Sequence, residues 1–319
     1  MGEPDPGDTT AVEDLAGVPA LARIYARTVP AALAGAVSTG VRRKTAVGEL
    51  PRVAYRVTRL RPDPDRVTDF ARLTRAPASD VLPPGFVHTM VFPVAMALLA
   101  RDDFPLPLPG LVHLRNVWTQ QRPVTLDSVL GVTTRAEDLR PHRAGTLVDV
   151  ISEIRDETGG GDPGERPVAI DRSTYLAWGR FLRGTVPTEG TERRDPFTPP
   201  LPTGQWRLGA DTGRRFAAVS GDWNPIHVSA PTARLLGMKG AIAHGMYTAS
   251  RGLATTRLPE SFTWDVTFAA PVLLPATVAV RVDGRPEDEA GARFTGWNPR
   301  SGRLHLTSTV RSTPPVPAD

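Results

Sequence analysis

Alternation of apolar and polar side chains is the first regular pattern along the chain. Apolar residues stand at every second position in VLGVTTRA and TVAVRVDG, residues 129–136 and 277–284, which is the period of a half-buried strand. Residues 146–157 and 173–182 are also rich in β-branched and apolar residues, and the Gly-rich run TGGGDPGE lies between them. We expect these two segments to form antiparallel strands joined by a turn.

Two other apolar segments, residues 91–99 and 246–253, predict helices. Each follows a short helical stretch and a polar loop, and each precedes alternating strands. Residues 292–312 repeat the strand–turn–strand pattern, with the turn at Asn298–Gly302. One apolar helix beside a meandering antiparallel sheet is an α+β layer architecture. The sequence therefore predicts an α+β fold in which two such units place two helices against one enlarged sheet.

The two halves of the chain resemble each other in three segments that occur in the same order. One match of this kind would be accidental, but three matches in register indicate a duplication. The matched pairs are residues 67–80 with 213–225, 85–100 with 241–254, and 117–139 with 266–288.

Composition divides the chain into five parts. The segment GTVPTEGTERRDPFTPPLPTG is rich in Pro, Gly, Thr and charge, which is typical of a linker. The predicted parts are a partly helical leader (1–48), a first repeat (49–183), the linker (184–204), a second repeat (205–313) and a short tail (314–319). Within the leader we expect a disordered tip followed by a surface helix in residues 21–37.

The overall composition excludes several function classes. The net charge is +4, and the arginines are scattered among acids with only 6% aromatic residues, unlike the dense basic stripe of a nucleic-acid binder. No apolar run approaches the ~20 residues of a membrane span, and the acidic start differs from a secretory signal. The chain has no cysteine, which excludes disulfides and thiolate chemistry. We expect a cytoplasmic protein.

The densest chemistry lies in SGDWNPIH, residues 220–227. Ser220 and Gly221 begin the loop, where glycine permits a tight turn. Pro225 restricts its own φ and holds Asn224 extended. The loop is therefore stiff, and we expect the side chains of Asp222 and His227 to converge as an acid/base pair.

Other interpretations of this loop remain open. Asp222 or Asn224 could cap a helix that begins near Ala230. Asp222, His227 and His244 could together bind a metal, although we predict no metal or cofactor. A calcium loop is disfavoured because His227 stands where that loop requires glycine.

The segment GAIAHGMYTASRGLA carries a second candidate group. Gly245 stands at the expected start of an apolar helix, where free N–H groups suit a carbonyl oxygen that gains negative charge. We interpret His244 as a hydrogen-bonded structural residue. A donor that polarises a carbonyl, beside an acid/base pair that adds or removes water, suggests reversible hydration of an α,β-unsaturated thioester.

The stretches FAAVSGDWNPIH and IAHGM resemble the hydratase-2 signature of the MaoC-like hydratases and dehydratases. The chain from about 48 to 312 is also similar to the actinobacterial double-hotdog (3R)-hydroxyacyl-thioester dehydratases. This resemblance implies a double hotdog fold, in which each repeat wraps an antiparallel sheet around a central helix. It implies that Asp222 and His227 activate water, that Asn224 orients the loop, and that the Gly245 amide binds the thioester oxygen.

The resemblance implies a substrate on coenzyme A or acyl carrier protein, and it implies no metal or redox cofactor. The first repeat departs from the signature, because residues 75–79 replace the Gly-Asp-Trp-Asn-Pro run and Thr89 replaces the glycine after His88. We therefore expect one active site per chain. A non-catalytic acyl-thioester-binding subunit and a hydratase for a specialised branched enoyl-CoA remain alternative functions. The sequence does not decide between a monomer and a homodimer.

Overall fold

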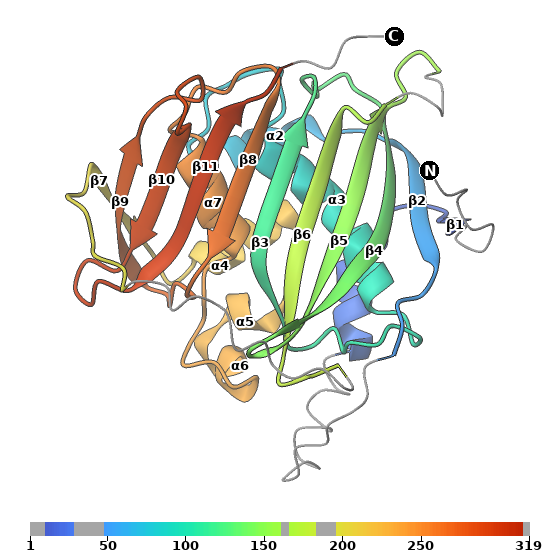
Figure 1. Cartoon of the computed structure of the whole chain (residues 1–319), viewed down its shortest axis with the longest axis horizontal. Helices are drawn as coiled ribbons and strands as arrows, with labels where there is room; N and C mark the ends of the chain where they lie inside the picture. The colour runs from blue at the N-terminus through green and yellow to red at the C-terminus, as the bar shows by residue number, and fades with distance from the viewer. Residues whose placement is uncertain (1–9, 29–47, 161–165, 183–195, 315–319) are drawn as a thin grey trace, which may run out of the picture.

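The computed structural model describes residues 10–28, 48–160, 166–182 and 196–314, and its ribbon is drawn in Figure 1. The strands of the described residues form one sheet in the order β1-β2-β4-β5-β6-β3-β8-β11-β10-β9-β7. Apart from the parallel pair β1·β2, neighbouring strands run antiparallel. Helices α2, α3, α4 and α7 lie behind the sheet in Figure 1, on one of its faces.

The sheet consists of two equivalent halves. One half has the order β2-β4-β5-β6-β3, and the other, read from the opposite edge, has β7-β9-β10-β11-β8. They meet where β3 pairs antiparallel with β8, from Arg115 opposite Thr267 to Gln120 opposite Phe262. The repeated order confirms the predicted α+β double hotdog architecture.

Both repeats contain helices followed by strands. In the first repeat the elements are β2 (Val53–Leu60), α2 (Pro64–Thr74), α3 (Pro84–Leu99), β3 (Leu111–Gln120), β4 (Leu130–His142), β5 (Gly145–Asp156) and β6 (Ala169–Trp178). In the second they are β7 (Gly204–Leu208), α4 (Thr212–Ser220), α5 (Pro225–Val228), α6 (Ala230–Leu235), α7 (Gly245–Leu253), β8 (Phe262–Phe268), β9 (Ala276–Asp283), β10 (Ala292–Trp297) and β11 (Leu304–Ser312).

Helix α3 is longer than the sequence pattern predicts. It begins at Pro84 and not at residue 91, because a proline is tolerated in the first helical turn, where its missing N–H would have no internal acceptor. The helix is buried on nearly all sides, so it lacks the one-sided apolar stripe that would mark its start. Helix α7 begins at Gly245, one residue before the predicted start.

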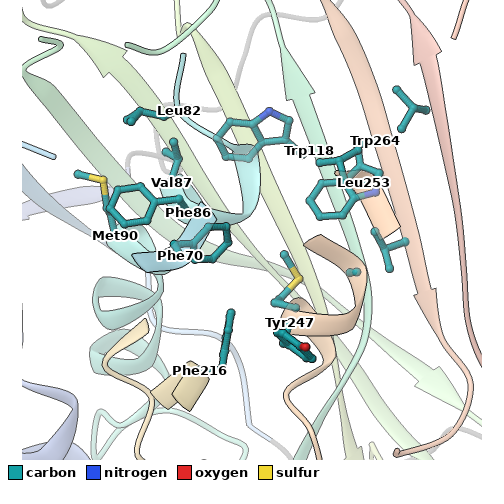
Figure 2. Packing of buried hydrophobic residues seen from close by; sticks show 14 of the residues in the cluster. Phe70, Leu82, Phe86, Val87, Met90, Trp118, Phe216, Tyr247, Leu253 and Trp264 are labelled. Atoms are coloured by element: carbon teal, nitrogen blue, oxygen red, sulfur yellow. The ribbon is translucent and has the colours of Figure 1, made fainter. Parts of the chain in front are cut away.

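The core is continuous across the two repeats. Trp118 on β3 lies directly opposite Trp264 on β8, and both indoles are buried. Phe70 of α2 and Phe216 of α4 occupy equivalent places in the two repeats, and their ring centroids are 5.9 Å apart. Figure 2 shows these aromatic side chains in one packed cluster. The repeats therefore share a core and are not two separately packed units.

The leader contains more regular structure than expected. Residues Ala11–Asp14 form β1, which pairs parallel with β2, and the guanidinium of Arg56 binds the carboxylate of Asp14. Residues 1–9, at the tip that we expected to be disordered, lie outside the described residues. Residues 21–28 are helical, as predicted, and the rest of the expected helix lies outside the described residues.

Several predicted boundaries fall largely outside the described residues. They include most of the linker (184–204), part of the Gly-rich turn after β5, and nearly all of the tail (314–319). The turn at Asn298–Gly302 does connect β10 to β11. In the described ranges, no helix is both long and apolar enough to cross a membrane.

Phe70→Ala should weaken the shared core. The ring is fully buried and also packs edge-to-face on Phe86, so its removal should cost about 3–5 kcal/mol of unfolding free energy. Urea unfolding followed by tryptophan fluorescence measures this as a lower midpoint. Leu201→Ala is the matched control because this side chain is 82% exposed. Equal midpoints for the two variants would contradict the shared core.

Candidate functional site

The loop that carries the candidate pair begins at the end of α4. Gly221 caps this helix in the left-handed conformation, with φ 78°, which side chains with a Cβ rarely adopt. Its N–H bonds the carbonyl of Ala217 at 2.8 Å. The chain therefore reverses sharply at Gly221 and turns Asp222 toward the interior.

Local hydrogen bonds hold Asp222 in place. The hydroxyl of Ser220 accepts from the Asp222 amide at 3.2 Å, and Oδ1 of Asp222 accepts from the Asn224 amide at 3.2 Å. The Asp222 side chain is only 14% exposed. A carboxylate with so little access to water must rely on protein donors.

Asn224 and Pro225 start the short helix α5. The side-chain oxygen of Asn224 accepts from the amide of Ile226 at 3.3 Å, and Pro225 occupies the first helical position. This cap fixes the direction of α5, which carries His227. A helix does begin at Ala230, as one alternative predicted, but Ser229 and not Asp222 or Asn224 caps it.

Among the described residues, one ring nitrogen of His227 has no hydrogen-bond partner. Its Nδ1 lies 2.9 Å from the carbonyl oxygen of Ile242, and a carbonyl only accepts, so Nδ1 carries the proton. This leaves the lone pair of Nε2 on a neutral ring. His227 is therefore equipped to take a proton at Nε2.

His244 contacts both Asp222 and His227. Its ring stacks on His227 with centroids 3.6 Å apart. Its Nε2 lies 3.0 Å from the backbone carbonyl of Asp222 and 3.6 Å from Oδ2 of that residue. Because a carbonyl needs a donor, Nε2 of His244 carries a proton and bonds the backbone of the Asp222 loop.

Gly245 opens α7 immediately after His244. At the first position of a helix the backbone N–H has no acceptor within that helix, so it is available to an external oxygen. A Cβ built on Gly245 would come within 2.9 Å of the Phe268 ring. The sequence therefore places glycine where the backbone must lie close to Phe268 of β8.

The electrostatics of the site favour an ionised carboxylate beside neutral imidazoles. Burial opposes ionisation of Asp222, but His244, His227 and hydrogen bonds from Tyr25 and Asn224 outweigh it, so its pKa lies below the usual value. Burial lowers the pKa of His227, opposed by Asp222. Burial and the neighbouring His227 lower the pKa of His244 to about 3.

One residue of the site has no counterpart in the sequence analysis. The hydroxyl of Tyr25, in the leader, donates to Oδ1 of Asp222 at 2.6 Å. The two residues are 197 positions apart, and a lone tyrosine in an alanine-rich segment carries no local signal for such a contact.

A cavity of 270 Å³ lies beside this loop. Its walls combine side chains of the leader, α3 and the end of α4, and include Leu21, Phe86, Met90, Ser220 and Gly221. Arg61, Asp63 and Arg66 also line this recess, so its walls are partly apolar and partly charged.

The equivalent region of the first repeat is built differently. His88, the counterpart of His244, has its Nδ1 2.7 Å from Oδ2 of Asp171 on β6. That carboxylate also accepts from the side-chain amide of Asn116. Asp80 is exposed, and within the described residues its carboxylate accepts a hydrogen bond from the Ser79 hydroxyl at 3.4 Å. The first repeat therefore buries its histidine–aspartate pair inside the sheet-facing core.

Comparison with known proteins identifies relatives over most of the chain. A family model described as "MaoC like domain" matches residues 190–289, which include Asp222, His227 and Gly245. The 3-hydroxyacyl-thioester dehydratase X of Mycobacterium tuberculosis is 36% identical over 265 residues, covering 82% of this chain and 90% of that protein.

Solved structures agree with this relationship. The crystal structure of HtdX of Mycobacterium tuberculosis matches with a TM-score of 0.67 and 33% identity, covering 82% of this chain and 100% of that one. A MaoC-like dehydratase from Phytophthora capsici matches with a TM-score of 0.60 over 82% of this chain and 95% of that one. At 17% identity, this second likeness supports the fold alone.

The metal alternative generates a prediction. Asp222, His227 and His244 have ligand atoms within 4.8 Å of one another, but Nε2 of His244, the ring nitrogen 3.6 Å from Asp222 Oδ2, carries the proton donated to the Asp222 carbonyl, so a metal at this nitrogen would have to break that hydrogen bond. We expect the purified protein to contain substoichiometric zinc, iron and nickel by elemental analysis. Added zinc should leave its thermal midpoint unchanged. A zinc-dependent rise of that midpoint, absent in His244→Ala, would establish a metal site instead.

Proposed function

Because the chain belongs to the family of MaoC-like dehydratases, we propose that it is a (3R)-hydroxyacyl-thioester dehydratase that also catalyses the reverse hydration of enoyl thioesters. The substrates are fatty acyl chains on coenzyme A or acyl carrier protein. One observation carries the proposal: an ionised Asp222 and a neutral His227 with a free Nε2 lie together beside the start of α7.

The acid/base pair of Asp222 and His227 transfers the proton of the reacting water. In the hydration direction the water oxygen bonds to C3 of the enoyl thioester while Asp222 and His227 hold the water through its hydrogens. One O–H bond breaks, the pair takes the proton, and the pair returns it to C2 to form the new C–H bond. Dehydration reverses these steps, so no group is consumed.

The Gly245 amide stabilises the negative charge that develops on the substrate. When oxygen bonds to C3, the electrons of the double bond move toward the thioester carbonyl, whose oxygen becomes negative. A backbone N–H at a helix start stabilises such an oxygen, and one donor of this type contributes about 10²–10³ in rate. The partial exposure of Gly245 leaves room for that oxygen.

The remaining parts of the proposal concern the acyl chain and the cellular setting. The apolar part of the cavity beside Gly221, formed by Phe86, Met90 and Leu21, is suited to the acyl chain. The reaction needs no metal or redox cofactor, because the proton is shuttled by side chains. A carrier-linked substrate and the cysteine-free composition support a cytoplasmic enzyme, and a homodimer remains part of the hypothesis.

Asp222→Asn and His227→Ala should each abolish most of the activity while leaving the fold intact. Loss of an acid/base group typically lowers a rate by about 10²–10⁴. The measurement is the absorbance loss of the conjugated thioester when crotonyl-CoA is hydrated.

Asp80→Asn is the matched control for these variants. Asp80 is an exposed carboxylate in the loop that follows α2 of the first repeat, so this variant should keep the wild-type rate. Wild-type turnover by Asp222→Asn would refute the proposed function and favour a non-catalytic binding subunit.

The pKa directions also predict the pH dependence of hydration. The rate requires ionised Asp222 and neutral His227, and both groups have pKa values below their usual range. Protonation therefore sets in only as pH falls below the ordinary histidine value of about 6.5. We expect kcat/KM for crotonyl-CoA to stay constant through neutral pH and to decline below that value. A decline that is already half complete at neutral pH would contradict the assignment.

A further inference from the structure

The leader lies against the Asp222 loop and helps to form its surroundings. Leu21 is 5% exposed and packs into the same cluster as Met96 and Leu99 of α3. Its side chain also lies beside Gly221, 3.9 Å from the position that a Cβ would take there. The helical residues 21–28 are therefore anchored next to the residue that precedes Asp222.

Tyr25 extends from this anchored helix to the carboxylate. Its hydroxyl donates to Oδ1 of Asp222 at 2.6 Å, and Oδ1 also accepts from the Asn224 amide. The other oxygen, Oδ2, lies 3.6 Å from Nε2 of His244. The two oxygens thus have separate surroundings, and Tyr25 holds one of them while the other stays on the side of the histidines.

The direction of this hydrogen bond is fixed. Burial and the negative charge of Asp222 both raise the pKa of Tyr25, so the phenol keeps its proton throughout the working range of the enzyme. An ionised carboxylate only accepts. A short bond from a neutral hydroxyl to a buried carboxylate belongs to the stronger class of hydrogen bonds.

We infer that Tyr25 is a positioning residue for the hydration reaction: its hydroxyl orients the Asp222 carboxylate and keeps it ionised, so that Oδ2 can hold the reacting water. This inference rests on the proposed function. It gives the leader a part in the active site, which the matched repeats of the chain do not predict.

The packing role of Tyr25 can be separated from the role of its hydroxyl. The ring contributes to the apolar cluster that contains Leu21, and phenylalanine has the same ring. Tyr25→Phe therefore removes the hydrogen bond and keeps the packing. Tyr55→Phe is the matched control, because Tyr55 bonds Arg101 at 2.8 Å and lies outside the site.

The test measures kcat, KM and the pH profile of crotonyl-CoA hydration for both variants, with thermal midpoints as a check of folding. We expect Tyr25→Phe to lower kcat roughly ten- to a hundredfold, as for a lost hydrogen bond to a charged group, with KM within about twofold of wild type. Tyr55→Phe should match the wild type.

The acid limb of the pH profile of hydration distinguishes the two roles, because a residue that only packs would leave this limb unchanged. Asp222 is faced by Tyr25 of the leader, Tyr175 of β6, His227 of α5 and His244 before α7. The Tyr25 hydrogen bond favours the ionised carboxylate, so its removal raises the pKa of Asp222. The acid limb should therefore move to higher pH in Tyr25→Phe.

Failure of this inference is distinguishable from failure of the proposed function. If Asp222→Asn is inactive but Tyr25→Phe keeps the wild-type kcat and acid limb, the positioning role is wrong and the reaction stands. A higher kcat/KM in Tyr25→Phe would also overturn it, because the hydroxyl would then be competing with water or substrate. If Asp222→Asn is fully active, the proposed function itself is wrong.

Discussion

The packing of the elements around the site depends on one buried charge. The Asp222 carboxylate lies where water has little access, and an isolated ion there would be strongly destabilised. Several donors and neighbours from separate parts of the chain compensate for the lost water: the Asn224 amide, the Tyr25 hydroxyl and the two histidines. Because these groups come from different elements, the carboxylate keeps its charge only while the leader, α5 and the start of α7 are correctly packed.

The pairing of β3 with β8 fixes how the two repeats pack against each other. It joins the two repeats into one sheet and sets α2 against α4, so that Phe70 and Phe216 share a core. Phe216 also packs on His244, with ring centroids 4.9 Å apart. The first repeat thus supports the second through direct contact, even though its own histidine, His88, is bound to Asp171 within the core.

Much of the fold and part of the site follow from local patterns. Period-two alternation and the turn at Asn298–Gly302 predict strands, and the internal matches predict the duplication. Glycine, proline and Asn224 predict a stiff loop because their backbone preferences act locally. These signals need no knowledge of the rest of the chain.

The remaining features depend on tertiary contacts that leave no local trace. The start of α3 is hidden because Pro83, Pro84 and Gly85 are typical of a turn, while burial on almost all sides makes the helix favourable. Strand β1 is four exposed residues that are ordered through pairing with β2. Tyr25 joins the site across 197 positions of sequence, so only the folded chain reveals it.

Strand β1 has a consequence for the ends of the sheet. An unpaired long strand at a sheet margin is a template for uncontrolled association between chains. Here the margin beyond β2 is covered by a four-residue strand that carries Glu13 and Asp14, and the opposite margin is the five-residue β7. Both margins are short strands, and one carries two acidic side chains; these are features that disfavour uncontrolled pairing with the strands of other chains.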